Sequence, residues 1–174
     1  AYDNNLLCIG EKQVFVVAAV FDRMMAAMER AGAVRLSGPQ VDALTRRALV
    51  MTGEGEHRHL VPCKDFIGQD AAVLAQAAGA ACAPGVELLF GETDTANPFV
   101  PVEQMMPFVP FVRCKDADEA IRLAHESEHG FRHTAIIHSN DVRTMTRMGR
   151  LLDTTLFVKN GPSVAGIGLG GEGY

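Results

Sequence analysis

Cys8 is the side chain in this sequence best suited to nucleophilic chemistry. It closes the polar segment 3–8 (DNNLLC) and precedes the apolar run of residues 14–20. A thiol in a polar loop just ahead of a buried strand is held by a rigid scaffold and stays within reach of a substrate. The alternative is a cysteine packed as a small hydrophobic residue, the more common fate of a free thiol. The local sequence leaves both roles open.

A thiol nucleophile needs a nearby base or another group that favours its ionised form. His133 ends the segment 128–133 (EHGFRH), directly ahead of an apolar run that predicts a buried strand. From such a loop an imidazole could face a catalytic site. The same position also suits a solvated histidine or one that caps the strand, so His133 is a candidate base only.

A metal site is the weaker interpretation of the other histidines. His57, His59 and Cys63 have nitrogen and sulfur ligands that suit zinc, but no fourth ligand stands at a characteristic spacing. A solvated loop explains this segment better, and we expect no metal.

Two further segments could bind a cofactor or substrate. Glu103 precedes the proline-flanked segment 107–113, and a carboxylate there could accept hydrogen bonds from a ribose diol or be a simple surface charge. The glycine-rich segment 166–171 is a weak dinucleotide motif, since no helix is predicted after it. A flexible loop that approaches a substrate is the better interpretation.

The apolar pattern predicts strands that alternate with helices. Strands are expected near residues 12–18, 87–90, 107–113, 134–138 and 155–158, with helices near 21–31, 40–51, 70–78, 120–124 and 141–152. The two prolines of 107–113 favour an edge or the start of a strand. This alternation predicts an α/β fold with a mostly parallel sheet and helices on both faces.

Composition excludes several classes of protein. The chain has 174 residues, of which 48% are hydrophobic and 21% are charged, and its net charge is −5. Without a basic run, neither nucleic acid nor an anionic membrane is an expected partner. The longest apolar stretch is too short to span a bilayer. The four scattered cysteines suggest reduced thiols and a cytoplasmic location.

Four of these segments occur together, in the same order, in one known family. Residues 3–9 (DNNLLCI), 103–107 (EQMMP), 128–135 (EHGFRHTA) and 157–163 (FVKNGPS) resemble the CoA-acylating aldehyde dehydrogenases, particularly the propionaldehyde and acetaldehyde dehydrogenases of bacterial microcompartments. The likeness runs nearly end to end. Each motif is weak alone, and their combination is specific.

The resemblance implies roles for individual residues. Cys8 would attack the aldehyde, the backbone N–H of Ile9 or of Cys8 itself would stabilise the oxyanion, and His133 would assist deprotonation of the thiol. Glu103 would hold the nicotinamide ribose of NAD. The small side chains of Pro162, Ser163 and Val164 would line the pocket for a short acyl group, which passes to coenzyme A.

The resemblance also implies a larger protein. Residues 1–174 would form its catalytic domain, and the dinucleotide-binding domain would precede residue 1. Full-length members usually form homo-oligomers, and a microcompartment shell is a further expected partner. Two alternatives remain: a hydrolytic aldehyde dehydrogenase that releases free acid, and a non-enzymatic α/β module for assembly in which Cys8 only packs.

Overall fold

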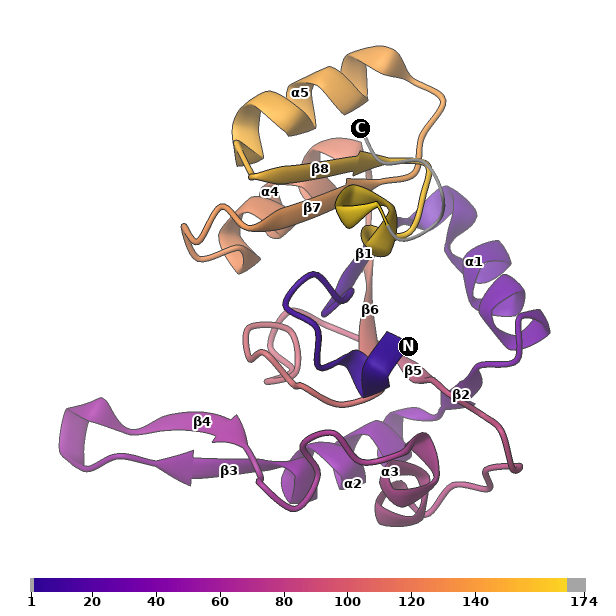
Figure 1. The fold of residues 1–174 in the computed structure, drawn as a ribbon, viewed down its shortest axis with the longest axis vertical. Helices are drawn as coiled ribbons and strands as arrows, with labels where there is room; N and C mark the ends of the chain where they lie inside the picture. The colour runs from indigo at the N-terminus through magenta and orange to yellow at the C-terminus, as the bar shows by residue number, and fades with distance from the viewer. Residues whose placement is uncertain (1, 169–174) are drawn as a thin grey trace.

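The computed structural model describes residues 2–168, in which helices and strands alternate along the chain (Figure 1). In chain order the elements are β1 (Val14–Val17), α1 (Ala18–Arg30), β2 (Val34–Leu36), α2 (Gly38–Ala48), β3 (Leu49–Thr52), β4 (His59–Pro62), α3 (Ala71–Ala78), β5 (Leu89–Thr93), β6 (Phe108–Cys114), α4 (Ala117–Ser127), β7 (Thr134–Ile137), α5 (Val142–Leu152) and β8 (Leu156–Lys159).

The described strands form three separate sheets. The central sheet is parallel throughout, with the strand order β1-β6-β5-β2. Strands β7 and β8 pair with each other in parallel, and β3 and β4 form an antiparallel hairpin. The mostly parallel arrangement that the sequence predicts is confirmed, although it is divided between a four-stranded and a two-stranded sheet.

Helices cover both faces of the central sheet. Successive residues of a strand point to opposite faces, and the apolar residues on each face pack against a different set of helices. Leu89 and Phe108 belong to the apolar cluster that packs under α2 and α3. Their neighbours Phe90 and Val109 belong to a second cluster, which contains Phe21 and Met25 of α1. The prediction of helices on both faces is therefore confirmed.

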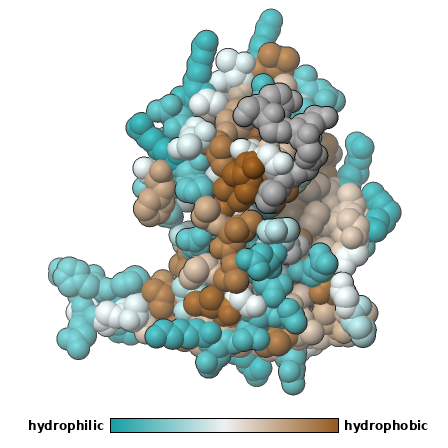
Figure 2. Space-filling model, in the orientation of Figure 1, coloured by the Kyte–Doolittle hydropathy of each residue, from teal (hydrophilic) through white to brown (hydrophobic). Residues whose placement is uncertain are grey.

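Helix α2 ends earlier than the sequence suggests. The predicted helix over residues 40–51 stops at Ala48, and the chain continues directly into the hairpin β3–β4. Val50 and Met51 are exposed on this hairpin. These two apolar residues, which the prediction included in the helix, therefore do not belong to its buried face. The hairpin projects from the body as an arm with a hydrophilic tip (Figure 2).

Strand β6 lies in the centre of its sheet, so the predicted edge position is wrong, whereas Pro107 does lie at the start of the strand. It pairs with β5 on one side and with β1 on the other. The Pro107 carbonyl accepts a hydrogen bond from Leu89 of β5, and backbone groups point to alternate sides along a strand. The nitrogen of Pro110 therefore faces β1, whose register begins only at Phe111. A proline fits this central strand because no partner needs its missing N–H.

Three other helix ends carry residues that favour them. Gly79 ends α3 in the left-handed conformation at φ 68°, which glycine adopts without strain. The Asp116 side chain accepts a hydrogen bond from the backbone N–H of Glu119 at the start of α4. Asp141 accepts one from Arg143 at the start of α5. These caps hold the helices in place against the sheets.

Candidate active site

Cys8 is exposed in the loop that precedes β1. The three residues Asp3, Asn4 and Asn5 all have positive φ angles of 50°, 48° and 63°. Asparagine and aspartate tolerate the left-handed region better than most other residues. The amide-rich sequence thus has a local reason: it permits a left-handed turn that leads the chain to an accessible thiol.

Asn5 anchors this loop in the protein interior. Its side chain is buried, and its amide donates hydrogen bonds to the carbonyl oxygens of Glu11 at 3.1 Å and Met106 at 3.5 Å. The side-chain oxygen of Asn5 lies where a Cβ at Gly10 would stand. Glycine at position 10 lets the loop fold back on itself, so the nucleophile segment is rigidly supported although Cys8 is exposed.

Glu103 lies beside this segment through a contact with Lys12. The amine of Lys12 donates a hydrogen bond to the carbonyl oxygen of Asn5 at 2.6 Å and lies 3.7 Å from Oε1 of Glu103. The Glu103 side chain is 58% exposed, so its carboxylate can still accept hydrogen bonds from a ligand. Burial lowers the pKa of Lys12, while the negative charge of Glu103 opposes that shift.

The predicted pocket loop is also bound to the nucleophile segment. Oε1 of Glu11 accepts a hydrogen bond of 2.9 Å from the backbone N–H of Ser163. Ser163 is buried, whereas Pro162 is exposed and Val164 is half-buried. These residues begin the short 3-10 helix Ser163–Ile167 after β8. The loop therefore meets the chain three residues after Cys8.

The backbone around Cys8 has donors for an oxyanion. Within residues 2–168, the N–H groups of Cys8 and Ile9 donate no hydrogen bond to another protein atom, whereas the N–H of Gly10 bonds to the Leu7 carbonyl at 2.9 Å. The Ile9 side chain is buried, which fixes the position of its backbone. A carbonyl oxygen bound near Cys8 could accept from either N–H.

His133 lies in a different part of the fold, immediately before β7. Its imidazole is exposed, with Nδ1 at 2.7 Å from the Thr134 hydroxyl, and its backbone N–H donates to Glu128. Among the described residues, no hydrogen bond joins it to Cys8, Glu103 or the pocket loop. A direct Cys8–His133 pair is therefore a prediction that the described contacts do not include.

The other cysteines occupy less accessible positions than Cys8. Cys63 and Cys82 are half-buried, and Cys114 is fully buried in β6. Burial raises the pKa of Cys114 to about 11, which keeps this thiol protonated near neutral pH. Cys8 is the cysteine whose exposure suits reaction with a substrate.

The structure offers no support for the zinc alternative. His57 and His59 are exposed at the tip of the β3–β4 arm, and Nδ1 of His59 lies 2.9 Å from the His57 carbonyl oxygen. In residues 2–168, no three His, Cys, Asp or Glu side chains are grouped as they would be around a metal ion. The same part of the chain contains no helix with the length and apolar character needed to cross a membrane.

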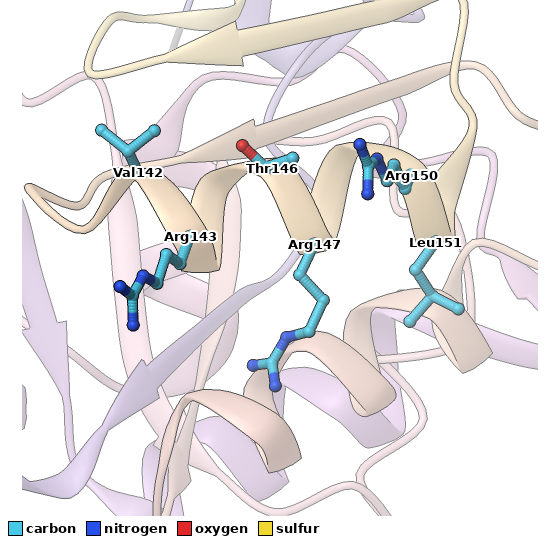
Figure 3. Close-up of a pocket in the computed structure, with 6 residues that line it drawn as sticks. All are labelled: Val142, Arg143, Thr146, Arg147, Arg150 and Leu151. Carbon is cyan, nitrogen blue, oxygen red and sulfur yellow. The ribbon is translucent and has the colours of Figure 1, made fainter.

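Cys8 does not line either of two depressions on the described surface. One, of about 590 Å³, runs along α5 and is lined by Val142, Leu151 and polar residues that include Arg143, Arg147 and Arg150 (Figure 3). Arg147 already pairs with Asp118 of α4. The second, of about 360 Å³, lies between the 92–95 segment and α4. Neither is lined by a predicted site residue.

Our sequence analysis missed the residues that join the parts of this site. Lys12 and Glu11 are adjacent in sequence, and they contact Glu103 and Ser163 respectively. Gln104 is fully buried and donates to the Lys12 carbonyl at 2.9 Å. The only feature of the sequence that could have indicated these contacts is the presence of charged and amide residues next to the motifs. The last three residues of the glycine-rich segment, 169–171, lie outside the described residues, so its proposed approach to substrate is not visible.

Known proteins of the same sequence type match the entire chain. It is 40% identical over 174 residues to the acetaldehyde dehydrogenase (acetylating) EutE of Salmonella typhimurium. It is 42% identical over 175 residues to the propanal dehydrogenase (CoA-propanoylating) of Citrobacter freundii. The chain is thus similar, along its whole length, to CoA-acylating aldehyde dehydrogenases. It spans 37% and 36% of the lengths of these two relatives. No family model matches the sequence.

Solved structures of this family share the fold. The propionaldehyde dehydrogenase of Rhodopseudomonas palustris, solved with bound CoA and an acylated cysteine, superposes with a TM-score of 0.88 at 41% identity. The match includes 99% of this chain and 38% of the Rhodopseudomonas palustris chain. A propionaldehyde dehydrogenase from the fucose utilisation microcompartment of Clostridium phytofermentans also has a TM-score of 0.88, at 34% identity, with 99% and 38% covered.

Proposed function

We propose that this chain carries the nucleophile of an NAD- and CoA-dependent aldehyde dehydrogenase that converts a short-chain aldehyde, such as propionaldehyde, into its acyl-CoA. The observation that carries this proposal is the position of Cys8, exposed at the end of a rigid loop beside Glu103 and Ser163. Relatives that act as acetylating and CoA-propanoylating dehydrogenases match the chain throughout, which supports CoA over water as the acyl acceptor.

The chemistry begins with a bond between the Cys8 sulfur and the aldehyde carbon. The carbonyl electron pair moves to oxygen, where the N–H groups of Ile9 and Cys8 donate hydrogen bonds. The resulting thiohemiacetal loses a hydride and becomes a thioester. The CoA thiol then attacks this thioester, the bond to Cys8 breaks, and acyl-CoA leaves with the Cys8 thiol restored.

His133 is proposed to take the proton from the Cys8 thiol. Its exposed imidazole is free to face a bound substrate, although it lies in the loop before β7 and not in the hydrogen-bonded group around Cys8. Apo geometry often leaves catalytic hydrogen bonds unformed until substrate binds.

The residues present fit a nicotinamide cofactor at Glu103. Its carboxylate is exposed and is held from one side by Lys12, which leaves its other oxygen able to accept from a ribose diol. NAD would supply the acceptor for the hydride. Glu103 would orient the ribose, and the loop of Pro162, Ser163 and Val164 would enclose the acyl chain and exclude water.

The domain organisation and partners follow from the same family. Residues 1–174 would be the catalytic domain, with a dinucleotide-binding domain before residue 1, as the greater length of the relatives suggests. We propose a homo-oligomer in a bacterial cytoplasm, enclosed in a microcompartment shell; the similar Clostridium phytofermentans enzyme comes from a bacterial microcompartment.

The test uses the complete protein, propionaldehyde and NAD, with NADH formation followed by absorbance. We expect turnover that requires CoA and yields propionyl-CoA. Cys8→Ala should abolish it, whereas Cys82→Ala, at a half-buried site far along the chain, should not. Full-rate turnover without CoA, giving free acid, would establish the hydrolytic alternative. Turnover that survives Cys8→Ala would remove Cys8 from the mechanism.

A further inference from the structure

The amine of Lys12 lies between two parts of the proposed site, and the reaction proposed above assigns it no role. Its side chain is only 14% exposed, while that of its partner Glu103 is 58% exposed. Lysine is rarely this inaccessible unless its charge is paired. A buried amine at this place therefore needs an explanation.

The contacts of the amine reach both neighbours at once. It donates to the carbonyl oxygen of Asn5, three residues before Cys8, at 2.6 Å, and lies 3.7 Å from Oε1 of Glu103. A carbonyl oxygen and a carboxylate both favour the charged ammonium. One cation thus connects the nucleophile segment with the carboxylate that would bind the ribose.

The backbone of Lys12 is fixed as well. The buried amide of Gln104 donates to the Lys12 carbonyl at 2.9 Å and to the carbonyl of Phe99. Gln104 follows Glu103 directly, so residues 12 and 103 are tied through both backbone and side chain. This backbone anchor places the Lys12 side chain next to Glu103.

The charges around the amine point the same way. Burial lowers the pKa of Lys12, and the negative charges of Glu103, Cys8 and Glu11 act against that effect. The ammonium thus lies beside the Glu103 carboxylate and is bonded to the segment that carries Cys8.

We propose that Lys12 is a positioning residue that holds Glu103 and the Asn5–Cys8 segment at a set separation. The inference rests on the proposed function, in which Glu103 orients the ribose and Cys8 carries the thiohemiacetal. Hydride transfer needs the two reacting carbons in close, aligned contact, and a displacement of about 1 Å can cost about 10²-fold in rate. Lys12 would set this alignment without touching the substrate.

The test compares Lys12→Met, Glu103→Gln and the double variant in the complete protein. Lys12→Met should lower kcat/KM for NAD by about 10²-fold and weaken NADH binding, measured by fluorescence. If Lys12 acts through Glu103, the double variant should be no worse than Glu103→Gln alone. Lys115→Met, which changes an exposed lysine just after the end of β6, is the matched control and should have the same kinetics as the wild type.

Two measurements that need no NAD distinguish a positioning role of Lys12 from a general effect on stability. Hydrogen exchange of segment 3–9 should speed up in Lys12→Met, because the Asn5 tether is lost, while exchange in the central strands stays unchanged. Acylation of Cys8 by propionyl-CoA, which needs no NAD, should fall much less than hydride transfer.

Lys12→Arg keeps the charge and should recover part of the lost hydride transfer.

The outcomes distinguish this inference from the proposed function. Wild-type kinetics in Lys12→Met, or additive losses in the double variant, would overturn the positioning role while leaving the Cys8 mechanism intact. A parallel loss of acylation, hydride transfer and global stability would make Lys12 merely structural. If Lys12→Met fails to fold, Lys12→Gln, which can still donate to Asn5, takes its place. Turnover that survives Cys8→Ala would instead reject the proposed function itself.

Discussion

Cys8 is unusual in combining a rigid backbone with an exposed side chain. The left-handed run of Asp3, Asn4 and Asn5 and the buried amide of Asn5 hold the loop, yet the sulfur remains accessible. Most free cysteines are buried and inert, as Cys114 is in β6. At the scale of single residues, the difference between these two thiols is the clearest indication of function.

Selective alkylation tests this difference. With iodoacetamide near neutral pH, Cys8 should react first, Cys63 and Cys82 more slowly, and Cys114 only after unfolding, because burial raises the pKa of Cys114 to about 11. Mass spectrometry of peptides taken over time measures each rate. Cys8→Ser is the control and should leave the other three rates unchanged. Equal rates at all four sites would favour a packing-only role for Cys8.

The proposed base gives a second prediction at this scale. His133→Ala should slow acylation of Cys8 in the complete protein by about 10²–10⁴-fold, the usual effect of losing a general base. His138→Ala, at another exposed histidine, is the matched control. Single-turnover mixing with propionaldehyde measures the step. An unchanged rate would exclude His133 from proton transfer.

At the scale of elements, helix caps and strand ends decide where side chains are presented. Helix α5 begins at Asp141, whose carboxylate accepts hydrogen bonds from the Thr144 hydroxyl at 2.6 Å and the Arg143 N–H at 3.0 Å. The hydrogen bond from Thr144, and then that from Arg143, lower the pKa of Asp141. The cap therefore stabilises α5 only while this carboxylate is ionised.

This cap should make stability depend on pH in a defined direction. Because the pKa of Asp141 is lower in the folded state than its ordinary value of 3.8, its contribution is complete above that value and is lost as pH falls through the folded pKa. Asp141→Ala should lower Tm near neutral pH, and the difference from wild type should shrink in acid. Circular dichroism measures Tm. A difference that is constant with pH would contradict this account, and Asp42→Ala, an exposed carboxylate within α2, controls for the lost charge.

At the scale of the whole molecule, the N-terminal segment lies between the α3 part of the fold and the β7–β8 part (Figure 1). Asn4 donates to Gly68 and Asp70 ahead of α3, and Glu11 accepts from Ser163 after β8. The central sheet lies between its two main apolar clusters, and Phe108 packs against Phe99 with ring centroids 4.7 Å apart. The site thus depends on the packing of the sheet, although no site residue belongs to it.

The core should carry most of the stability. Phe108→Ala removes a fully buried ring from the centre of the sheet and should reduce the free energy of unfolding by about 3–5 kcal/mol. Phe131→Ala removes a ring that is 82% exposed and should change it by less than about 0.5 kcal/mol. Urea unfolding followed by circular dichroism measures both. Similar losses in the two variants would contradict the described core.

The sequence alone determined the alternation of strands and helices, and it singled out Cys8 as a candidate nucleophile while leaving a packing role open. Local signals such as an aspartate at a helix start and Gly79 at the end of α3 also agree with the structure. Each depends on neighbours a few residues away, where backbone preference and hydrogen bonding act directly. The family resemblance supplied the roles of Glu103, His133 and the 162–164 loop. The comparisons confirmed the resemblance, while those roles stay predictions.

Only the tertiary structure decided that Pro110 lies in a central strand, that α2 stops at Ala48, and that Lys12 and Glu11 bind Glu103 and Ser163. These features depend on strand register and on contacts between residues some 90 to 150 positions apart. Such contacts leave no periodic signal in the chain, because they arise when sheets and loops pack in space and satisfy buried polar groups together.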